Sequence, residues 1–148
     1  MAVFVINEWL WADLSGANSR GHQIEAISLI EHLVTCDHQI VVIEGSEFDR
    51  KAWNLCKSTD TLVVKSVVAF VKDIRQNSDR CLILRPEAAA PLPDGLAAEI
   101  KPDDRYLIQA QLAVAGAIIV TTDGPLREAL HRFGLGCITR EEFLDTLL

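Results

Sequence analysis

KPDDRYLIQAQLAVAGAIIVTTDGPLREAL, residues 101–130, contains the strongest structural signal in the sequence. Pro102 suits the first turn of a helix, which predicts a helix start beside Asp103 and Asp104. Apolar residues then recur at helical spacing, namely Leu107, Ala110, Ala113 and Val114. Residues 117–120 are small or β-favouring and predict a short buried strand. The segment therefore predicts a helix followed by a strand of a parallel sheet.

Acidic residues lie on both sides of this strand. Asp103 and Asp104 open the helix before it, and Asp123 follows its end, where Gly124 and Pro125 offer a further helix start. In α/β sheets, sites lie at the carboxyl edge of the strands, so acids far apart in sequence can meet there. The alternative for each acid on its own is helix capping, because an aspartate at a helix start satisfies free backbone amides.

The first third of the chain alternates strands with helices. Residues 3–6 are a continuous apolar run that predicts a central strand. Residues 23–34 carry apolar side chains at helical spacing, and residues 40–43 predict a second strand. Ser46, followed three residues later by Asp49, predicts the N-cap of another helix.

The middle of the chain has a weaker pattern. Residues 61–64 predict a short strand, residues 66–74 a helix, and residues 81–84 another strand. Residues 86–102 contain four prolines, which predicts a loop with one short helical turn at residues 96–99.

The C-terminal residues predict a last helix, because Thr139 and Glu142 fit the capping-box spacing. Alternation of strands and helices along the chain implies a parallel sheet with helices on both faces. The predicted fold is α/β, a three-layer α/β/α sandwich with a central, mostly parallel sheet. With 148 residues and 49% hydrophobic content, residues 1–148 are expected to form a single domain.

Composition limits the function classes. The formal net charge of -7 argues against a surface that binds nucleic acid nonspecifically, since such surfaces use Lys and Arg to neutralise phosphates. The four cysteines form no C-x-x-C pair, and we interpret them as reduced core residues of a cytoplasmic protein. The histidines lack the spacing of a zinc site. The apolar N-terminus is too short to span a bilayer, so no membrane partner is expected.

Several oxygen-bearing side chains are expected to converge at the carboxyl edge of the sheet. Asn7, Glu44 and Asp123 follow strands, and Asp103 and Asp104 open a helix whose preceding loop can reach the same edge. Crowded carboxylates repel one another unless a cation neutralises them, and Mg²⁺ or Mn²⁺ does so with a few carboxylates and several waters. Such a site can bind phosphate and activate water for attack on phosphorus, so it predicts a phosphodiesterase.

Asp104, the small-residue-rich helix after it, the apolar strand and the T-T-D motif at residues 121–123 resemble the PIN domain superfamily of metal-dependent ribonucleases. Residues 136–139 and 141–144 resemble the family's closing strand and helix. The resemblance implies a PIN-like fold and an endoribonuclease that cleaves RNA with Mg²⁺ or Mn²⁺. It also implies that the protein is the toxin of a toxin-antitoxin pair. Its partners would then be RNA and an antitoxin or another protein, and a homodimer is possible.

Matched position by position, Asp104 takes the family's acidic position before the strand, and Asp103 is the alternative by one register step. Asp123 matches the family's aspartate after the strand, and Thr121 matches its threonine, which we interpret as a positioning residue. The resemblance thus implies that Asp104 and Asp123 are catalytic residues and metal ligands.

Two positions depart from the family pattern. Where the family has an aspartate at the end of the first strand, this chain has Asn7 followed by Glu8, and asparagine offers a neutral oxygen without negative charge. The family also has a glutamate on the helix after the second strand, for which Glu44 and Glu47 are candidates that the sequence does not separate. The further catalytic candidates are therefore Asn7 and Glu44, and the further metal-ligand candidates are Asp103, Asn7, Glu8 and Glu47.

These departures leave a second function open, a catalytically impaired PIN-like module that binds RNA or a protein partner. A receiver domain with an acidic pocket ranks last, because no lysine follows a late strand in the expected place. Aromatic and basic side chains could contact RNA, but they are more often packing residues and solvated charges. These residues are Trp9, Trp11, Trp53, Arg50, Lys51, Arg85, Arg105, Arg127 and Arg132.

Overall fold

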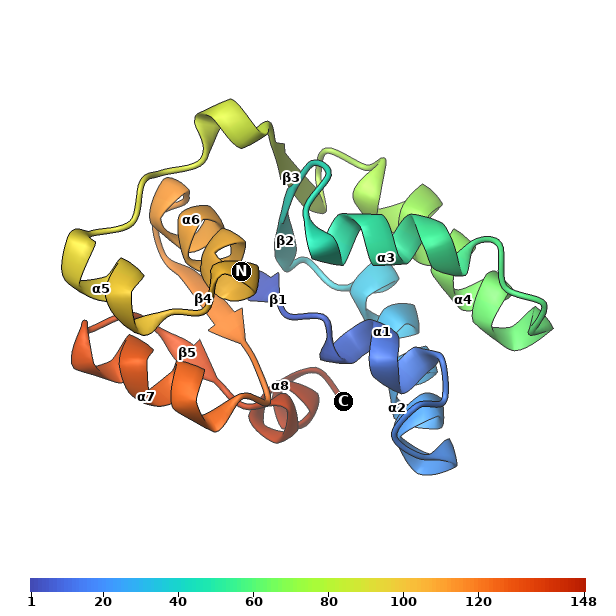
Figure 1. Cartoon of the computed structure of the whole chain (residues 1–148). Helices are drawn as coiled ribbons and strands as arrows, with labels where there is room; N and C mark the ends of the chain where they lie inside the picture. The colour runs from blue at the N-terminus through green and yellow to red at the C-terminus, as the bar shows by residue number, and fades with distance from the viewer.

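The computed structural model describes residues 1–148 and contains a five-stranded sheet (Figure 1). Its strand order is β3-β2-β1-β4-β5, and every neighbouring pair is parallel. The strands are β1 (Val3–Ile6), β2 (Gln39–Ile43), β3 (Cys81–Leu84), β4 (Ala117–Val120) and β5 (Cys137–Ile138). Because all strands are parallel and β1 lies at the centre, their carboxyl ends meet at one edge of the sheet.

Helices cover both faces of the sheet. They are α1 (Trp9–Leu14), α2 (Arg20–Thr35), α3 (Glu47–Leu55), α4 (Thr61–Phe70), α5 (Asp94–Glu99), α6 (Arg105–Ala113), α7 (Gly124–Arg132) and α8 (Arg140–Leu147). Apolar residues of α1, α2, α3, α4 and α8 share one hydrophobic core, and those of α5, α6 and α7 share a second. The predicted α/β class is confirmed, and the sheet is parallel throughout, with its two helical layers consistent with a three-layer sandwich.

The strands supply both cores at once. In β1, Phe4 and Ile6 belong to the core with α1 and α2, whereas Val5 belongs to the core with α6 and α7. Successive strand residues point to opposite faces, so a strand covered on both sides is apolar at nearly every position. This is the physical reason for the unbroken apolar runs in the sequence.

Three predicted helix caps are present. The Ser46 hydroxyl accepts a hydrogen bond from the Asp49 amide at 3.4 Å, and Asp123 Oδ1 accepts one from the Leu126 amide at 3.0 Å. At the start of α8, the side chain and backbone of Thr139 form a capping box with Glu142. The sequence thus located the starts of α3, α7 and α8.

The predicted strand at residues 61–64 is wrong, because these residues begin α4. Asp60 caps this helix, and its Oδ1 accepts hydrogen bonds from the amides of Leu62 at 3.0 Å and Val63 at 3.4 Å. The cap and the burial of one helix face outweigh the β-preference of the valines. The helix continues from Phe70 into one turn of π-helix, Val71–Arg75, close to the end predicted for it.

Helix α1 was not predicted. It has only six residues and no side-chain cap, so the sequence gives no start signal. Trp9 and Trp11 are buried, in agreement with their interpretation as packing residues, whereas Trp53 is 41% exposed. The indole N–H of Trp9 donates to the Val120 carbonyl at 3.0 Å, which fixes α1 against the end of β4.

Two buried ion pairs that the sequence did not reveal join helices on the same face. Arg140 Nε on α8 donates to Asp13 Oδ2 on α1 at 2.7 Å, and the side chains are 5% and 2% exposed. Arg75, in the π-turn, contacts both carboxylate oxygens of Asp49 on α3, at 2.5 and 3.0 Å. Both carboxylate oxygens of Asp49 are therefore used in an ion pair within the fold.

The four cysteines form no disulfide, but only Cys81 is fully buried. Cys36, Cys56 and Cys137 are half-buried, so the expectation of core cysteines holds for one of the four. None of the helices combines the length and the apolar character that crossing a membrane requires.

We expect Arg140→Met to lower the free energy of unfolding by about 3–5 kcal/mol, because it leaves the buried Asp13 carboxylate without its partner. Urea denaturation measures the change. Arg132→Met is the matched control, since it breaks the exposed Arg132–Glu99 pair and should cost under about 1 kcal/mol. Equal losses in the two variants would contradict a special role for the buried pair.

Candidate active site at the carboxyl edge of the sheet

The ends of β1 and β4 are joined by hydrogen bonds. Just beyond β1, the Asn7 amide donates to the Val120 carbonyl at 3.0 Å, and Asn7 Nδ2 donates to Thr121 Oγ1 at 3.0 Å. The fully buried Thr121 hydroxyl also accepts from the Asp123 amide at 3.1 Å. Thr121 therefore positions Asn7 and the loop that carries Asp123.

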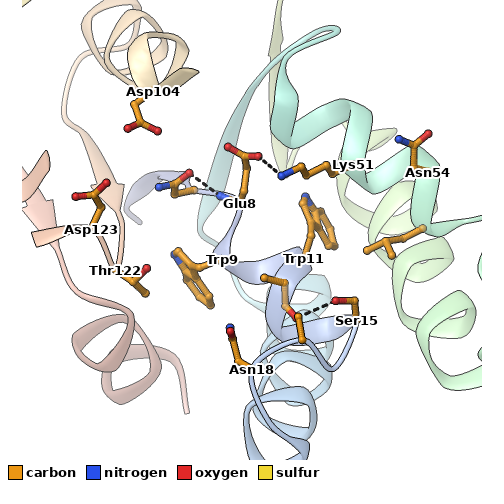
Figure 2. Close-up of a pocket in the computed structure, with 14 residues that line it drawn as sticks. Glu8, Trp9, Trp11, Ser15, Asn18, Lys51, Asn54, Asp104, Thr122 and Asp123 are labelled. Carbon is orange, nitrogen blue, oxygen red and sulfur yellow. Dashed lines mark hydrogen bonds and ion pairs between the residues drawn. The ribbon is translucent and has the colours of Figure 1, made fainter. Parts of the chain in front are cut away.

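A cleft of about 700 Å³ opens at this edge (Figure 2). Its walls come from the end of β1, helices α1 and α3, the start of α6 and the loop after β4. The charged side chains that line it are Glu8, Lys51, Asp104 and Asp123. Asn7 also lines it, so four of the predicted site residues are brought together.

Asp104 and Asp123 face this cleft from different elements, and their side chains point toward the same space in Figure 2. Partial burial and then the negative charges of Asp123 and Glu8 raise the pKa of the Asp104 carboxyl above its ordinary value. Asp123 Oδ1 caps α7, whereas the Asp104 side chain makes no capping hydrogen bond. Asp123 therefore caps a helix as well as lining the cleft. Helix capping by its side chain does not explain the position of Asp104.

Glu8 lies between two helices. Its Oε1 is 2.5 Å from Lys51 Nζ on α3, and its Oε2 accepts a hydrogen bond from the Tyr106 hydroxyl on α6 at 3.4 Å. Burial and then the charges of Glu8 and Asp104 raise the pKa of the Tyr106 hydroxyl, which keeps it a donor. Glu8 is therefore held in place by a cation on one side and a neutral donor on the other.

Three other predicted candidates do not line the cleft. Asp103 is exposed, although it is next to Asp104. Glu44 follows β2 as predicted but is exposed, and Glu47 forms an ion pair with Arg50 on its own helix. No group of three or more His, Cys, Asp or Glu side chains lies close enough to hold a metal ion.

Sequence reasoning missed the other half of the cleft. Away from the carboxylates, the walls carry uncharged polar side chains, including Ser15, Asn18 and Asn54 (Figure 2). Lys51, which the sequence predicts to be a solvated charge, also lines the cleft. No sequence signal identifies these residues, because α1 was not predicted and α3 contributes to the cleft only through its packing.

No protein-family model matches this chain, and no curated protein matches it either.

The raised pKa of Asp104 predicts a pH-dependent effect of Asp104→Asn. A carboxyl whose pKa is higher in the folded state binds more protons there, so its contribution to stability falls as pH rises from the ordinary to the raised pKa. We expect Asp104→Asn to be more stable relative to the wild type at about pH 7 than at about pH 3.

Urea denaturation across this pH range measures the difference. Asp103→Asn is the matched control, because it makes the same chemical change at an exposed neighbour that does not line the cleft. A difference between Asp104→Asn and wild type that does not change with pH would contradict the electrostatic account.

Proposed function

We propose that this protein is a PIN-like endoribonuclease that cleaves RNA phosphodiester bonds with Mg²⁺ or Mn²⁺. The observation that carries the proposal is the convergence of Asp104, Asp123 and Glu8 on one cleft at the carboxyl edge of the parallel sheet. The resemblance of residues 104–123 to the PIN superfamily supplies the choice of RNA and the toxin role, with an antitoxin or other protein as partner.

The carboxylates fit one hydrated divalent cation. Mg²⁺ is usually bound by one or two protein carboxylates and takes its other ligands from water and substrate phosphates. Asp104 and Asp123 would supply those two carboxylates. Burial raises the pKa of Asp104, and the negative charges of Asp123 and Glu8, which a cation would neutralise, raise it further. A cation bound there supplies a Lewis acid for the phosphodiester group.

The other residues of the site have positioning roles. Thr121 holds Asn7 and the backbone of Asp123, so the two strand ends keep a fixed separation. Tyr106 orients Glu8 toward the cleft. The cleft continues past the carboxylates toward Asn18 and Asn54, and this half gives room for the nucleotides next to the scissile bond.

Cleavage of labelled single-stranded RNA tests this proposal. We expect the wild type to cleave in Mn²⁺, and we expect Asp104→Asn/Asp123→Asn to fall to the level of an EDTA control, because both proposed ligands lose their charge. Asp79→Asn/Asp145→Asn is the matched control, since both residues are exposed and outside the cleft. Cleavage that survives in the Asp104→Asn/Asp123→Asn variant would rule out this site.

A second function is favoured by the contacts of Asn7. Both ends of its amide are used within the protein: Nδ2 donates to Thr121, and Oδ1 accepts from the Glu8 amide at 2.7 Å. Asn7 brings no negative charge, and the charge of Glu8 is neutralised by Lys51. These contacts support a catalytically impaired PIN-like module that binds RNA or a protein partner.

Asn7→Asp distinguishes the two functions. If the module is impaired, the wild type should bind RNA without cleaving it, and Asn7→Asp should gain Mn²⁺-dependent cleavage because it adds a carboxylate to the cleft. The Thr121 hydroxyl can donate to that carboxylate, so the local contact is kept. Asn54→Asp is the control with the same change at the far side of the cleft. Wild-type cleavage as fast as that of Asn7→Asp would exclude the impaired module.

A further inference from the structure

The two edges of the sheet differ in how well they are protected. One edge is β5, which has only two residues, and a strand this short offers little for another chain to pair with. The other edge is β3, whose four residues, Cys81–Leu84, are all apolar. It lacks the charge or proline with which proteins commonly protect an edge strand, and it pairs with β2 alone. The outer side of β3 is therefore an unprotected pairing edge.

A groove of about 590 Å³ opens along β3. All four strand residues line it, together with Arg75, Gln76 and Ser78. Because successive strand side chains point to opposite faces, a groove that all four residues line lies along the free edge and not on one face. Ile83 is 40% exposed, and it is the only exposed large hydrophobic residue in any strand. The space beside β3 is thus open to another chain.

The direction of the backbone groups of β3 follows from its bonds to β2. The carbonyls of Arg80 and Leu84 accept hydrogen bonds, at 2.9 and 2.8 Å, from amides in and just after β2. Backbone groups of alternate residues point to opposite sides of a strand, so those of Cys81 and Ile83 face the free edge. Those of Arg85 do so as well, because its backbone is still extended, with φ -74° and ψ 149°.

The unbonded groups on this edge form a self-complementary set. The Cys81 amide already donates to the Asn77 carbonyl at 2.9 Å, and the Arg85 carbonyl already accepts from the Ala88 amide at 2.9 Å. The Cys81 carbonyl, both groups of Ile83 and the Arg85 amide remain. An acceptor before Ile83 thus matches a donor after it. An antiparallel copy with Ile83 opposite Ile83 satisfies the whole set: the two Ile83 residues exchange hydrogen bonds, and each Arg85 amide donates to the other Cys81 carbonyl.

We propose that the free edge of β3 pairs antiparallel with β3 of a second copy of this chain, about a two-fold axis at Ile83, so that the two sheets become one. A second copy is the occupant because the unbonded set complements itself, as a two-fold interface requires. The side chains agree with this register. Leu82 lies opposite Leu84 of the other copy and Arg85 opposite Cys81, so no like charges face each other.

This surface is separate from the candidate active site. The groove along β3 and the cleft at the carboxyl edge share no lining residue, so the inference does not depend on the proposed function. Because the two copies of β3 run in opposite directions, the carboxyl edge of one sheet lies beside the amino edge of the other. The two clefts of the dimer would therefore open at opposite edges of the joined sheet.

Sedimentation equilibrium between about micromolar and about millimolar protein tests the pairing. A four-residue edge buries less than the roughly 1,200 Å² of a standard interface, so we expect a weak, concentration-dependent dimer. Ile83→Lys should raise the Kd of dimerisation at least about tenfold, because two lysines would face each other across the two-fold axis. Ile24→Lys is the matched control, since it makes the same change at an isoleucine of α2 that is 52% exposed. It should keep the wild-type Kd, and thermal unfolding checks that both variants are folded.

Amide hydrogen exchange of the wild type tests the register without a mutation. The amides of Ile83 and Arg85 should exchange more slowly at the high protein concentration than at the low one, because they donate only in the dimer. The Leu82 amide faces β2 and should exchange equally at both. Protection of Ile83 that does not change with concentration, or an Ile83→Lys variant that dimerises as well as the wild type, would overturn the inference. So would a wild type that stays monomeric, which would leave this edge to a strand of a different protein.

Discussion

The parallel pairing of β1 with β4 is the constraint on which the candidate site depends. The strands pair in register along their full length, so the residues that follow them, Asn7 and Thr121, are adjacent and hydrogen-bonded. The loop after β4 brings Asp123 into the same cleft as Glu8, which precedes α1. Because every strand of the sheet is parallel, no other edge collects strand ends and helix starts in this way. The position of the cleft follows from the topology before any side chain is considered.

Electrostatics at this edge opposes folding. Asp104 is partly buried near two further carboxylates, and burial first, then their negative charges, raise the pKa of its carboxyl. The protein balances its other buried charges: Asp13 is paired with Arg140, and Asp49 with Arg75. A carboxylate cluster left partly unbalanced, in a protein that pairs its buried acids, marks this cleft as the candidate functional site.

The sequence predicted what depends on local patterns. Apolar runs located all four of the longer strands, and cap residues such as Ser46 and Asp123 located helix starts. The sequence prediction failed at residues 61–64, where the β-preference of the valines suggested a strand. Asp60 caps a helix there instead. The sequence could place Asp104 and Asp123 at one edge, but it could not find the partners of Glu8. Lys51 and Tyr106 reach Glu8 from α3 and α6, and only the packing of these helices brings them together.

Asn7 has a different meaning once the contacts are known. In the sequence, Asn7 stands where the PIN pattern has an aspartate, so the predicted site lacks one carboxylate. In the structure the next residue, Glu8, lines the same cleft, and Asn7 Oδ1 fixes its backbone by accepting a hydrogen bond from the Glu8 amide. The charge is therefore displaced by one residue and is paired with Lys51. The negative charge of the cleft is therefore set by the Glu8–Lys51 pair as well as by the residue at position 7.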